Sequence, residues 1–179
     1  MEVRIQAIHF DASERLQDFI QKKVAKLEKF CDDIKKVEVS LKVVKPETAM
    51  NKEAGVKVLA LNGEFFAEKV SDTFEESVDV CVDALSKQLI KAKEKLQEFI
   101  QKKVAKLEKF CDDIKKVEVS LKVVKPETAM NKEAGIKVLA LNNEFFAEKV
   151  SDTFEESVDV CVDALSKQLT KAKEKLRGK

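Results

Sequence analysis

The feature that most constrains how this chain folds is an internal repeat. A shift of 80 residues aligns residues 17–96 with residues 97–176, and the two copies differ at four positions: Asp18/Glu98, Val56/Ile136, Gly63/Asn143 and Ile90/Thr170. Solenoid families have shorter periods and copies that have drifted apart, so this pattern indicates the tandem duplication of one module. The near-identity leaves two origins open, a very recent duplication or a deliberately designed fusion.

Each copy carries the pattern of a small α+β module. Apolar runs, most of them alternating, predict strands over residues 3–8, 37–44, 55–62 and 63–70. The last two runs meet at Asn62-Gly63, where we expect a type I′ hairpin turn, because both central residues of such a turn need a positive φ. Asn142-Asn143 replaces this dipeptide in the second copy.

Two amphipathic helices follow from apolar residues spaced three and four apart. In the first helix these residues are Leu16, Phe19, Ile20, Val24, Leu27 and Phe30, and in the second they are Phe74, Val78, Cys81, Val82, Leu85 and Leu89. The pairs Asp11/Glu14 and Asp72/Glu75 have capping-box spacing, so we expect them to open the two helices. The predicted order of the module is β-α-β-β-β-α.

The junction between the copies carries no signal that would end a helix. Apolar positions continue at steps of one, three or four from Phe74 to Cys111 without glycine or proline. We therefore expect one helix over residues 73–111, on the order of 58 Å long. This helix would join a complete module, residues 1–96, to a duplicated module, residues 97–179. Random duplication endpoints keep helical register only by chance, so the register favours design or strong selection.

The duplication is incomplete, because residues 1–16 have no counterpart in the second copy. The second module therefore has the order α-β-β-β-α and lacks the first strand. If that strand pairs with residues 37–44, the equivalent strand Val117–Val124 is left as an open edge with unpaired backbone groups. We expect the second module either to form a two-fold homodimer through this edge or to be less stable than the first.

Composition argues against several classes of protein. The chain has a net charge of +1, one histidine (His9) and four cysteines, none of them in a C-x-x-C pair. We find no catalytic triad, paired-carboxylate geometry, phosphate loop or metal-ligand spacing, so we expect no enzyme, no cofactor and no metal, and reduced, buried thiols. No apolar run approaches the roughly 20 residues that span a bilayer and the start lacks a signal-peptide pattern, so we expect no membrane partner and a cytoplasmic location.

Three segments carry a family resemblance. They are MEVRIQAIHFDASERLQDFIQKKVAKLEKF, NGEFFAEKVSDTFEESVDV and DALSKQLIKAKEKL, with KLEKF and S-K-Q-L-x-K as the best signatures. In this order and spacing, residues 1–96, and residues 97–176 without the first strand, resemble the ribosome hibernation promoting factor family, also called protein Y or sigma-54 modulation protein. The resemblance implies a mixed sheet in the order 1-2-3-4, with the first strand parallel to the second and the helices on one face. It also implies a non-enzymatic stress-response factor that binds small-subunit rRNA near the decoding centre and silences translation.

Binding to folded rRNA requires phosphate contacts from cationic side chains on a rigid face. The candidate residues of the first copy would form adjacent basic ridges on the two helices, and they are Lys22, Lys23, Lys26, Lys29, Lys87, Lys91, Lys93 and Lys95. Their second-copy equivalents are Lys102, Lys103, Lys106, Lys109, Lys167, Lys171 and Lys173. The resemblance implies that Lys23, Lys26, Lys87 and Lys91 are the best candidates of the first copy. Ala84 stands where the family commonly has a lysine, and Asp83 adds a negative charge beside it.

Other interpretations stay open. The lysines are also consistent with an ordinary solvated helix surface, the chain with a designed tandem scaffold without a binding function, and the α-β-β-β-α order with a binder of plain duplex RNA. A helix-fused tandem would fit poorly into a channel that accepts one compact module, so its activity would be reduced or lost. The pairs Phe65/Phe66 and Phe145/Phe146 suggest a base-stacking platform, but consecutive strand residues face opposite sides, so one residue of each pair belongs to the core.

Overall fold

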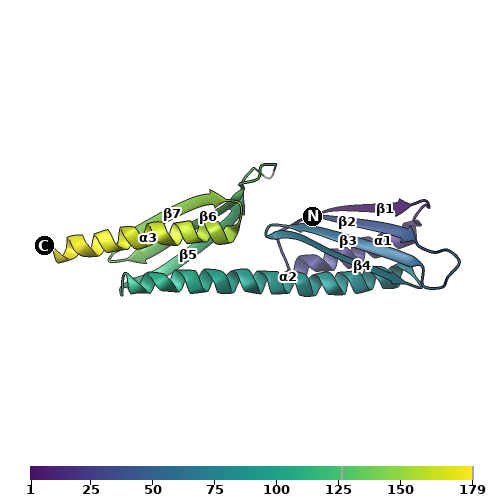
Figure 1. Ribbon diagram of the computed structural model, residues 1–179, viewed down its shortest axis with the longest axis horizontal. Coiled ribbons are helices and arrows are strands. Elements are labelled where there is room, and N and C mark those ends of the chain that lie inside the picture. The colour runs from purple at the N-terminus through teal and green to yellow at the C-terminus, as the bar shows by residue number, and fades with distance from the viewer. Residues whose placement is uncertain (126, 179) are drawn as a thin grey trace. The chain divides into compact units, whose positions relative to one another are not determined.

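The computed structural model describes residues 1–125 and 127–178, and the chain divides into two compact units, residues 1–94 and residues 95–179. In the described part, unit 1 comprises β1 (Glu2–Ile8), α1 (Glu14–Val24), the 3-10 helix η1 (Ala25–Lys29), β2 (Ile34–Val43), β3 (Lys52–Ala60), β4 (Gly63–Ser71) and the first part of α2 (Phe74–Ala105). Unit 2 comprises the rest of α2, the 3-10 helix η2 (Lys106–Lys109), β5 (Ile114–Val123), β6 (Lys132–Ala140), β7 (Asn143–Ser151) and α3 (Phe154–Arg177). The predicted order of elements is confirmed, including the absence of a first strand from the described part of unit 2 (Figure 1).

The sheet of unit 1 has the topology that the resemblance implied. Its strands follow the order β1-β2-β3-β4, with β1 parallel to β2 and the other neighbours antiparallel. Along β2, Val37, Val39 and Leu41 are buried in the core, whereas Ser40 between them is exposed, because successive strand residues face opposite sides. Helices α1 and α2 cover the same face of this sheet (Figure 1). The predicted mixed sheet with helices on one face is confirmed.

Unit 2 repeats the antiparallel part of this arrangement. Its strands follow the order β5-β6-β7, and Val117 pairs with Val138 just as Val37 pairs with Val58 in unit 1. Leu107 of η2, the 3-10 helix that continues α2, is fully buried in the core of unit 2 together with residues of α3. The C-terminal part of α2 therefore packs against the core of unit 2 in the way that α1 packs against the core of unit 1.

Helix α2 passes through the repeat junction without a break. It has 32 residues, which corresponds to about 48 Å at 1.5 Å per residue. Its buried residues from Phe74 to Leu89 belong to the core of unit 1, while Phe99 and Ile100 pack against the core of unit 2. The α-helix ends at Ala105, earlier than the expected residue 111, because the last turn tightens into the 3-10 helix η2, as commonly occurs at helix ends.

The start of α1 differs from its predicted capping box. The helix begins at Glu14, and the Oγ atom of Ser13 accepts a hydrogen bond from the backbone N–H of Leu16 at 3.3 Å. The predicted cap at Asp11 is therefore wrong, because a capping side chain must directly precede the first helical residue to reach its free N–H groups.

The start of α2 requires the same correction. The Oγ1 atom of Thr73 accepts a hydrogen bond from the backbone N–H of Glu76 at 3.1 Å, so Thr73 caps this helix and the predicted box at Asp72 is wrong. The carboxylate of Asp72 instead accepts a hydrogen bond from the backbone N–H of Met50 at 2.9 Å. Asp72 thus ties the loop before β3 to the end of β4.

The hairpin turn between β3 and β4 lies one residue earlier than predicted. Ala60 pairs with Gly63, so the central turn residues are Leu61-Asn62, and the positive φ of 143° falls on Gly63 at the start of β4. In unit 2, where Asn143 replaces this glycine, the central residues Leu141-Asn142 both take left-handed φ values, 52° and 57°. The positive φ therefore falls on Gly63 in unit 1, and in unit 2, without that glycine, a different, left-handed conformation falls on the two preceding residues.

Candidate nucleic-acid interface

The exposed side of α1 and η1 carries a row of lysines. Lys22, Lys26 and Lys29 are separated by intervals of four and three residues, which places them on one face of the helix, and all three side chains are exposed. We call these three residues the α1 lysine face. The buried residues Leu16, Ile20, Val24 and Leu27 hold the opposite side of the same helix against the sheet.

Two further charged residues lie on the same side of α1 as the α1 lysine face. Arg15 precedes Lys22 by seven residues, or about two turns, and Asp18 precedes it by four, and both are exposed. Cations therefore dominate this face. Sequence reasoning overlooked Arg15, although its heptad spacing from Lys22 was the signal that could have found it.

Lys23 has a different environment from its neighbours. Its Nζ atom forms an ion pair with Asp79 of α2 at 2.6 Å and lies over the ring of Phe19 at 5.0 Å from the ring centre, and its side chain is 27% exposed. Lys23 therefore links α1 to α2. A partly exposed pair of this kind contributes little to stability, but it occupies the ammonium group, which leaves Lys23 less available for an outside partner than Lys22 or Lys26.

The candidate lysines of α2 do not form one continuous row. Lys87 and Lys91 are exposed and one turn apart, but Asp83 and Glu94 lie on the same side of the helix, so this side carries mixed charge. At 100° per residue, Lys93 points about 120° away from Lys87. The α2 lysines are thus a weaker cationic surface than the α1 lysine face.

The topology brings the two lysine groups of unit 1 to the same level. Because α1 follows β1 and α2 follows β4, and these two strands run in the same direction, both helices fold back across the sheet in the same direction. The pair Lys23–Asp79 fixes their relative position along the axis. At about 1.5 Å per residue, and slightly more in η1, we infer that Lys29 lies level with the turn of α2 that contains Lys87, whereas Lys26 lies about one turn earlier, level with Val82.

The second-copy candidates show similar surroundings within unit 2. Lys102, Lys106 and Lys109 are exposed, as are Lys167 and Lys171. Lys103 repeats the arrangement of Lys23, with an ion pair to Asp159 at 2.5 Å and a position over the Phe99 ring at 5.0 Å. Lys173 forms an ion pair with Asp112 at 3.4 Å.

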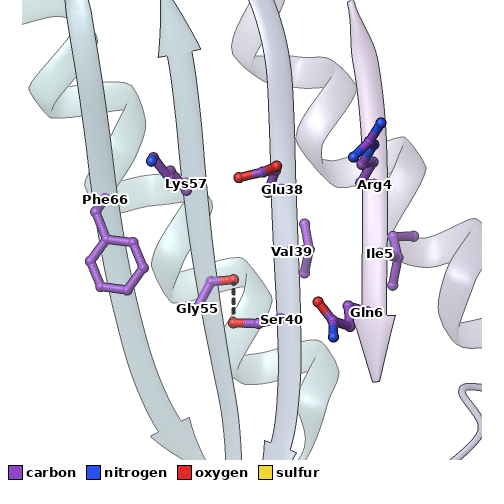
Figure 2. Close-up of a pocket in the computed structure, with 9 residues that line it drawn as sticks. All are labelled: Arg4, Ile5, Gln6, Glu38, Val39, Ser40, Gly55, Lys57 and Phe66. Atoms are coloured by element: carbon purple, nitrogen blue, oxygen red, sulfur yellow. Dashed lines mark hydrogen bonds between the residues drawn. The ribbon is translucent and has the colours of Figure 1, made fainter. Parts of the chain in front are cut away.

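The other face of the sheet in unit 1 forms a shallow hollow of about 510 Å³ (Figure 2). Gly55 lies at its centre, where an added Cβ would be 2.8 Å from the Ser40 Oγ and 3.4 Å from the Phe66 ring, so glycine leaves room for that ring. Phe66 is 55% exposed, while Phe65 packs against the core. The prediction that one phenylalanine of the pair faces the core is confirmed, and base stacking on Phe66 stays a prediction.

Charged groups beside this hollow are paired with one another. Lys57 forms an ion pair with Glu64 at 2.9 Å, and the hydrogen bond from Lys57 to Glu64 raises the lysine pKa above its usual value. The hydrogen bond from Lys36 to Glu38 likewise lowers the pKa of that carboxyl group. These charges compensate each other, so the sheet face offers less uncompensated positive charge than the α1 lysine face.

All four cysteines are free thiols, and Cys81, Cys111 and Cys161 are buried as expected, but the expectation is wrong for Cys31, which is half-buried. The Cys81 thiol donates a hydrogen bond to the Ala54 carbonyl oxygen at 3.3 Å, and burial raises its pKa to about 11. Cys161 repeats this contact with Ala134, and its pKa is also raised by burial to about 11. Within the described ranges, no group of three His, Cys, Asp or Glu residues is placed to hold a metal ion. No helix in the described part of the chain is long and apolar enough to span a membrane.

Comparison with known proteins places the chain in a family. The family model described as "Sigma 54 modulation protein / S30EA ribosomal protein" matches residues 3–97 and again residues 92–177. The chain belongs to this family, and the second match agrees with the repeated module.

Individual relatives match about half of the chain and nearly all of their own length. The chain is 32% identical over 101 residues to the ribosome hibernation promoting factor of Pseudomonas putida strain KT2440, covering 56% of this chain and 95% of the relative. It is 32% identical over 98 residues to the factor of the same name from Escherichia coli K12, covering 55% and 99%.

Solved structures of similar proteins cover a comparable share of the chain. The Protein Y N-terminal domain of Thermus thermophilus matches with a TM-score of 0.46 and 19% identity, over 51% of this chain and 98% of that structure. A ribosomal subunit interface protein from Coxiella burnetii matches with a TM-score of 0.46 and 21% identity, over 52% and 99%.

Proposed function

We propose that this chain is a ribosome-associated hibernation factor that binds the rRNA of the small subunit and silences translation in the cytoplasm. The observation that carries the proposal is membership of the family, with relatives named ribosome hibernation promoting factor that align over 95% to 99% of their length. Silencing requires no chemical step. We infer that the factor acts by occupying the path that mRNA and tRNA use.

We assign the contact with rRNA to unit 1, chiefly to the α1 lysine face. Lys22, Lys26 and Lys29 are exposed and project from a helix whose other side is buried, so their ammonium groups are displayed on a rigid support. Lysine contacts to phosphate release condensed counterions and supply affinity without reading base identity. The folded shape of the rRNA would then determine where the unit binds. Lys87 and Lys91 extend the contact from the neighbouring helix.

Co-sedimentation with purified small ribosomal subunits at two salt concentrations tests this proposal. The triple substitution Lys22→Gln, Lys26→Gln and Lys29→Gln removes the α1 lysine face. We expect it to weaken binding and to reduce the slope of log K against log salt by about three, roughly one for each lost phosphate contact. Binding by the triple variant with unchanged affinity and salt dependence would contradict the assignment.

The repeat supplies a matched control. Lys102→Gln, Lys106→Gln and Lys109→Gln change the same residues in the same local sequence of unit 2. Because unit 2 lacks the first strand and so is incomplete relative to the family module, we expect this variant to bind like the unsubstituted chain. Equal losses from both triple variants would assign binding to both units.

A designed tandem scaffold without a binding function is the second candidate. It is favoured by the near-identity of the repeats and by a helix that keeps its register through the junction. The same experiment separates the two. Absence of co-sedimentation even at low salt, with a chain that is folded by circular dichroism, supports the scaffold and shows that the fused form has lost the activity of the family.

A further inference from the structure

Strands β2 and β5 have the same ten-residue sequence, IKKVEVSLKV, but different neighbours. In unit 1, β2 lies between β3 and β1, and β1 pairs with it along all seven residues from Glu2 to Ile8. In unit 2, β5 pairs with β6 on one side, and no described strand pairs with its other side. One side of β5 therefore presents backbone N–H and C=O groups without a ladder partner, which is the condition that favours strand addition.

The core-facing side chains of β5 are also less buried than those of β2. Ile34, Val37, Val39 and Leu41 of β2 are buried, with exposures between 0% and 6%. Their counterparts Ile114, Val117, Val119 and Leu121 are all half-buried. We call these four residues the β5 apolar row. Since the two strands have identical sequences, the difference comes from their surroundings, because unit 2 has no counterpart of residues 1–16, which include the strand β1.

We propose that the open edge of β5 binds the open edge of β5 in a second copy of this chain, antiparallel and around a two-fold axis. The chain already contains one strand that fits this edge, β1, but β1 is fully paired with β2. Its transfer to β5 would open an identical edge on β2 and gain nothing. Pairing of two β5 strands leaves neither edge open and buries two copies of the β5 apolar row. The proposal is independent of ribosome binding.

Charge complementarity selects the register. If the two-fold axis passes through Ser120, Glu118 lies opposite the partner's Lys122, and Val119 lies opposite the partner's Leu121. If it passes through Val119 instead, Lys116 lies opposite the partner's Lys122, and like charges directly opposite each other destabilise a strand pair. We therefore place the axis at Ser120. The ion pairs Lys116–Glu118 (2.5 Å) and Lys122–Glu133 (2.6 Å) involve exposed lysines, so exchanging them costs little.

Disulfide trapping tests this geometry directly. Residues directly opposite in an antiparallel pair have Cβ atoms about 4.5–5.5 Å apart, close to the separation that a disulfide spans. We expect the Ser120→Cys variant, under mild oxidation, to form a covalent dimer on a non-reducing gel. The matched control is Ser40→Cys, which places a thiol in the same sequence on the strand that β1 covers and should cross-link no faster than the unsubstituted chain with its four cysteines.

Sedimentation velocity over a concentration series gives the oligomeric state of the unsubstituted chain, which we expect to shift from monomer to dimer. Glu118→Lys should weaken the dimer about tenfold, because it creates two symmetric like-charge contacts with Lys122. Combining it with Lys122→Glu should restore association, whereas Glu38→Lys in unit 1 should leave the dimer unchanged. A chain that stays monomeric at all concentrations, or a dimer in which Ser120→Cys cross-links no faster than Ser40→Cys, overturns the proposal.

Discussion

Leu41 and Leu121 occupy equivalent positions in identical local sequences, yet they have different surroundings. Leu41 is fully buried, and its strand neighbour Ala7 belongs to β1. Leu121 is half-buried at the open edge of β5. Substitution by alanine removes the same atoms at both positions. The difference between the two losses of stability therefore measures what the missing strand contributes to the core.

The expected magnitudes follow from burial. Replacing a fully buried leucine by alanine costs about 2–5 kcal/mol, because transfer free energy is lost and a cavity remains, so we expect about 3 kcal/mol for Leu41→Ala. A half-buried leucine loses less transfer free energy and leaves a site that is open to water instead of a closed cavity. We expect about 1.5 kcal/mol for Leu121→Ala.

The assay must distinguish two nearly identical units. Hydrogen exchange followed by mass spectrometry in increasing urea does so, if it is evaluated on β3 peptides that contain Val56 and β6 peptides that contain Ile136, because these differ in mass. The protein is kept at low micromolar concentration so that self-association does not cover β5. Equal losses of stability in the two units would refute the reasoning that β1 completes the core of unit 1 and that its absence weakens unit 2.

Three further predictions concern single features of the fold. Thr73→Ala should destabilise unit 1, and Thr153→Ala unit 2, each by about 1 kcal/mol through loss of an N-cap. Hydrogen exchange of the Val56 peptide reports on unit 1 and that of the Ile136 peptide on unit 2, and unchanged protection of the corresponding peptide would contradict the cap. Because the pKa of folded Cys81 is about 11 against an ordinary value near 9, its contribution to stability should be constant below pH 9 and should decline from about pH 9 to pH 11. Urea unfolding across this range should show a shallower decline for the Cys81→Ala, Cys161→Ala double variant than for the unsubstituted chain, and identical declines would argue against the shift. Glu94→Pro should break α2 at a cost of about 3 kcal/mol and reduce the helical circular dichroism signal at 222 nm, and an unchanged signal would mean that this segment is not helical.

Much of the fold was predictable because it depends on periodic patterns. The apolar stripes of α1 and α2 recur every three or four residues, so they predicted both helices and their buried sides. The continuation of that pattern past Leu96 predicted that α2 crosses the junction. The absence of residues 1–16 from the second copy predicted a unit without a first strand. Each of these signals is spread over many residues, and a single ambiguous position does not alter it.

The details that failed depend on single residues with competing options. The spacing of Asp11 and Glu14 predicts a capping box, but Ser13 is also of a residue type favoured at N-caps, and it is the residue that caps α1. His9 takes a left-handed φ of 64° in the linker after β1, and the Phe10 ring stacks on Phe74 with centres 5.1 Å apart, so this part of the linker is held by a tertiary contact and not by helical structure. A local pattern does not contain such a contact.

The candidate site was partly predictable for a similar reason. Helical spacing places Lys22, Lys26 and Lys29 on one face without knowledge of the fold. It does not reveal that Lys23 pairs with Asp79, because that contact depends on how α1 and α2 pack against each other. Nor does helical spacing of the lysines alone show that Asp83 and Glu94 offset the positive charge of Lys87 and Lys91. That requires considering the acids and lysines on each helical face together.

The most direct test of the central claim is lysine acetylation of the chain in complex with small ribosomal subunits, evaluated on peptides that extend to Asp18 or Glu98 and so distinguish the two copies. Our account predicts that binding protects Lys22, Lys26 and Lys29, while Lys102, Lys106 and Lys109 react as they do in the free chain. Full reactivity of the first three lysines in a chain that remains bound would contradict it.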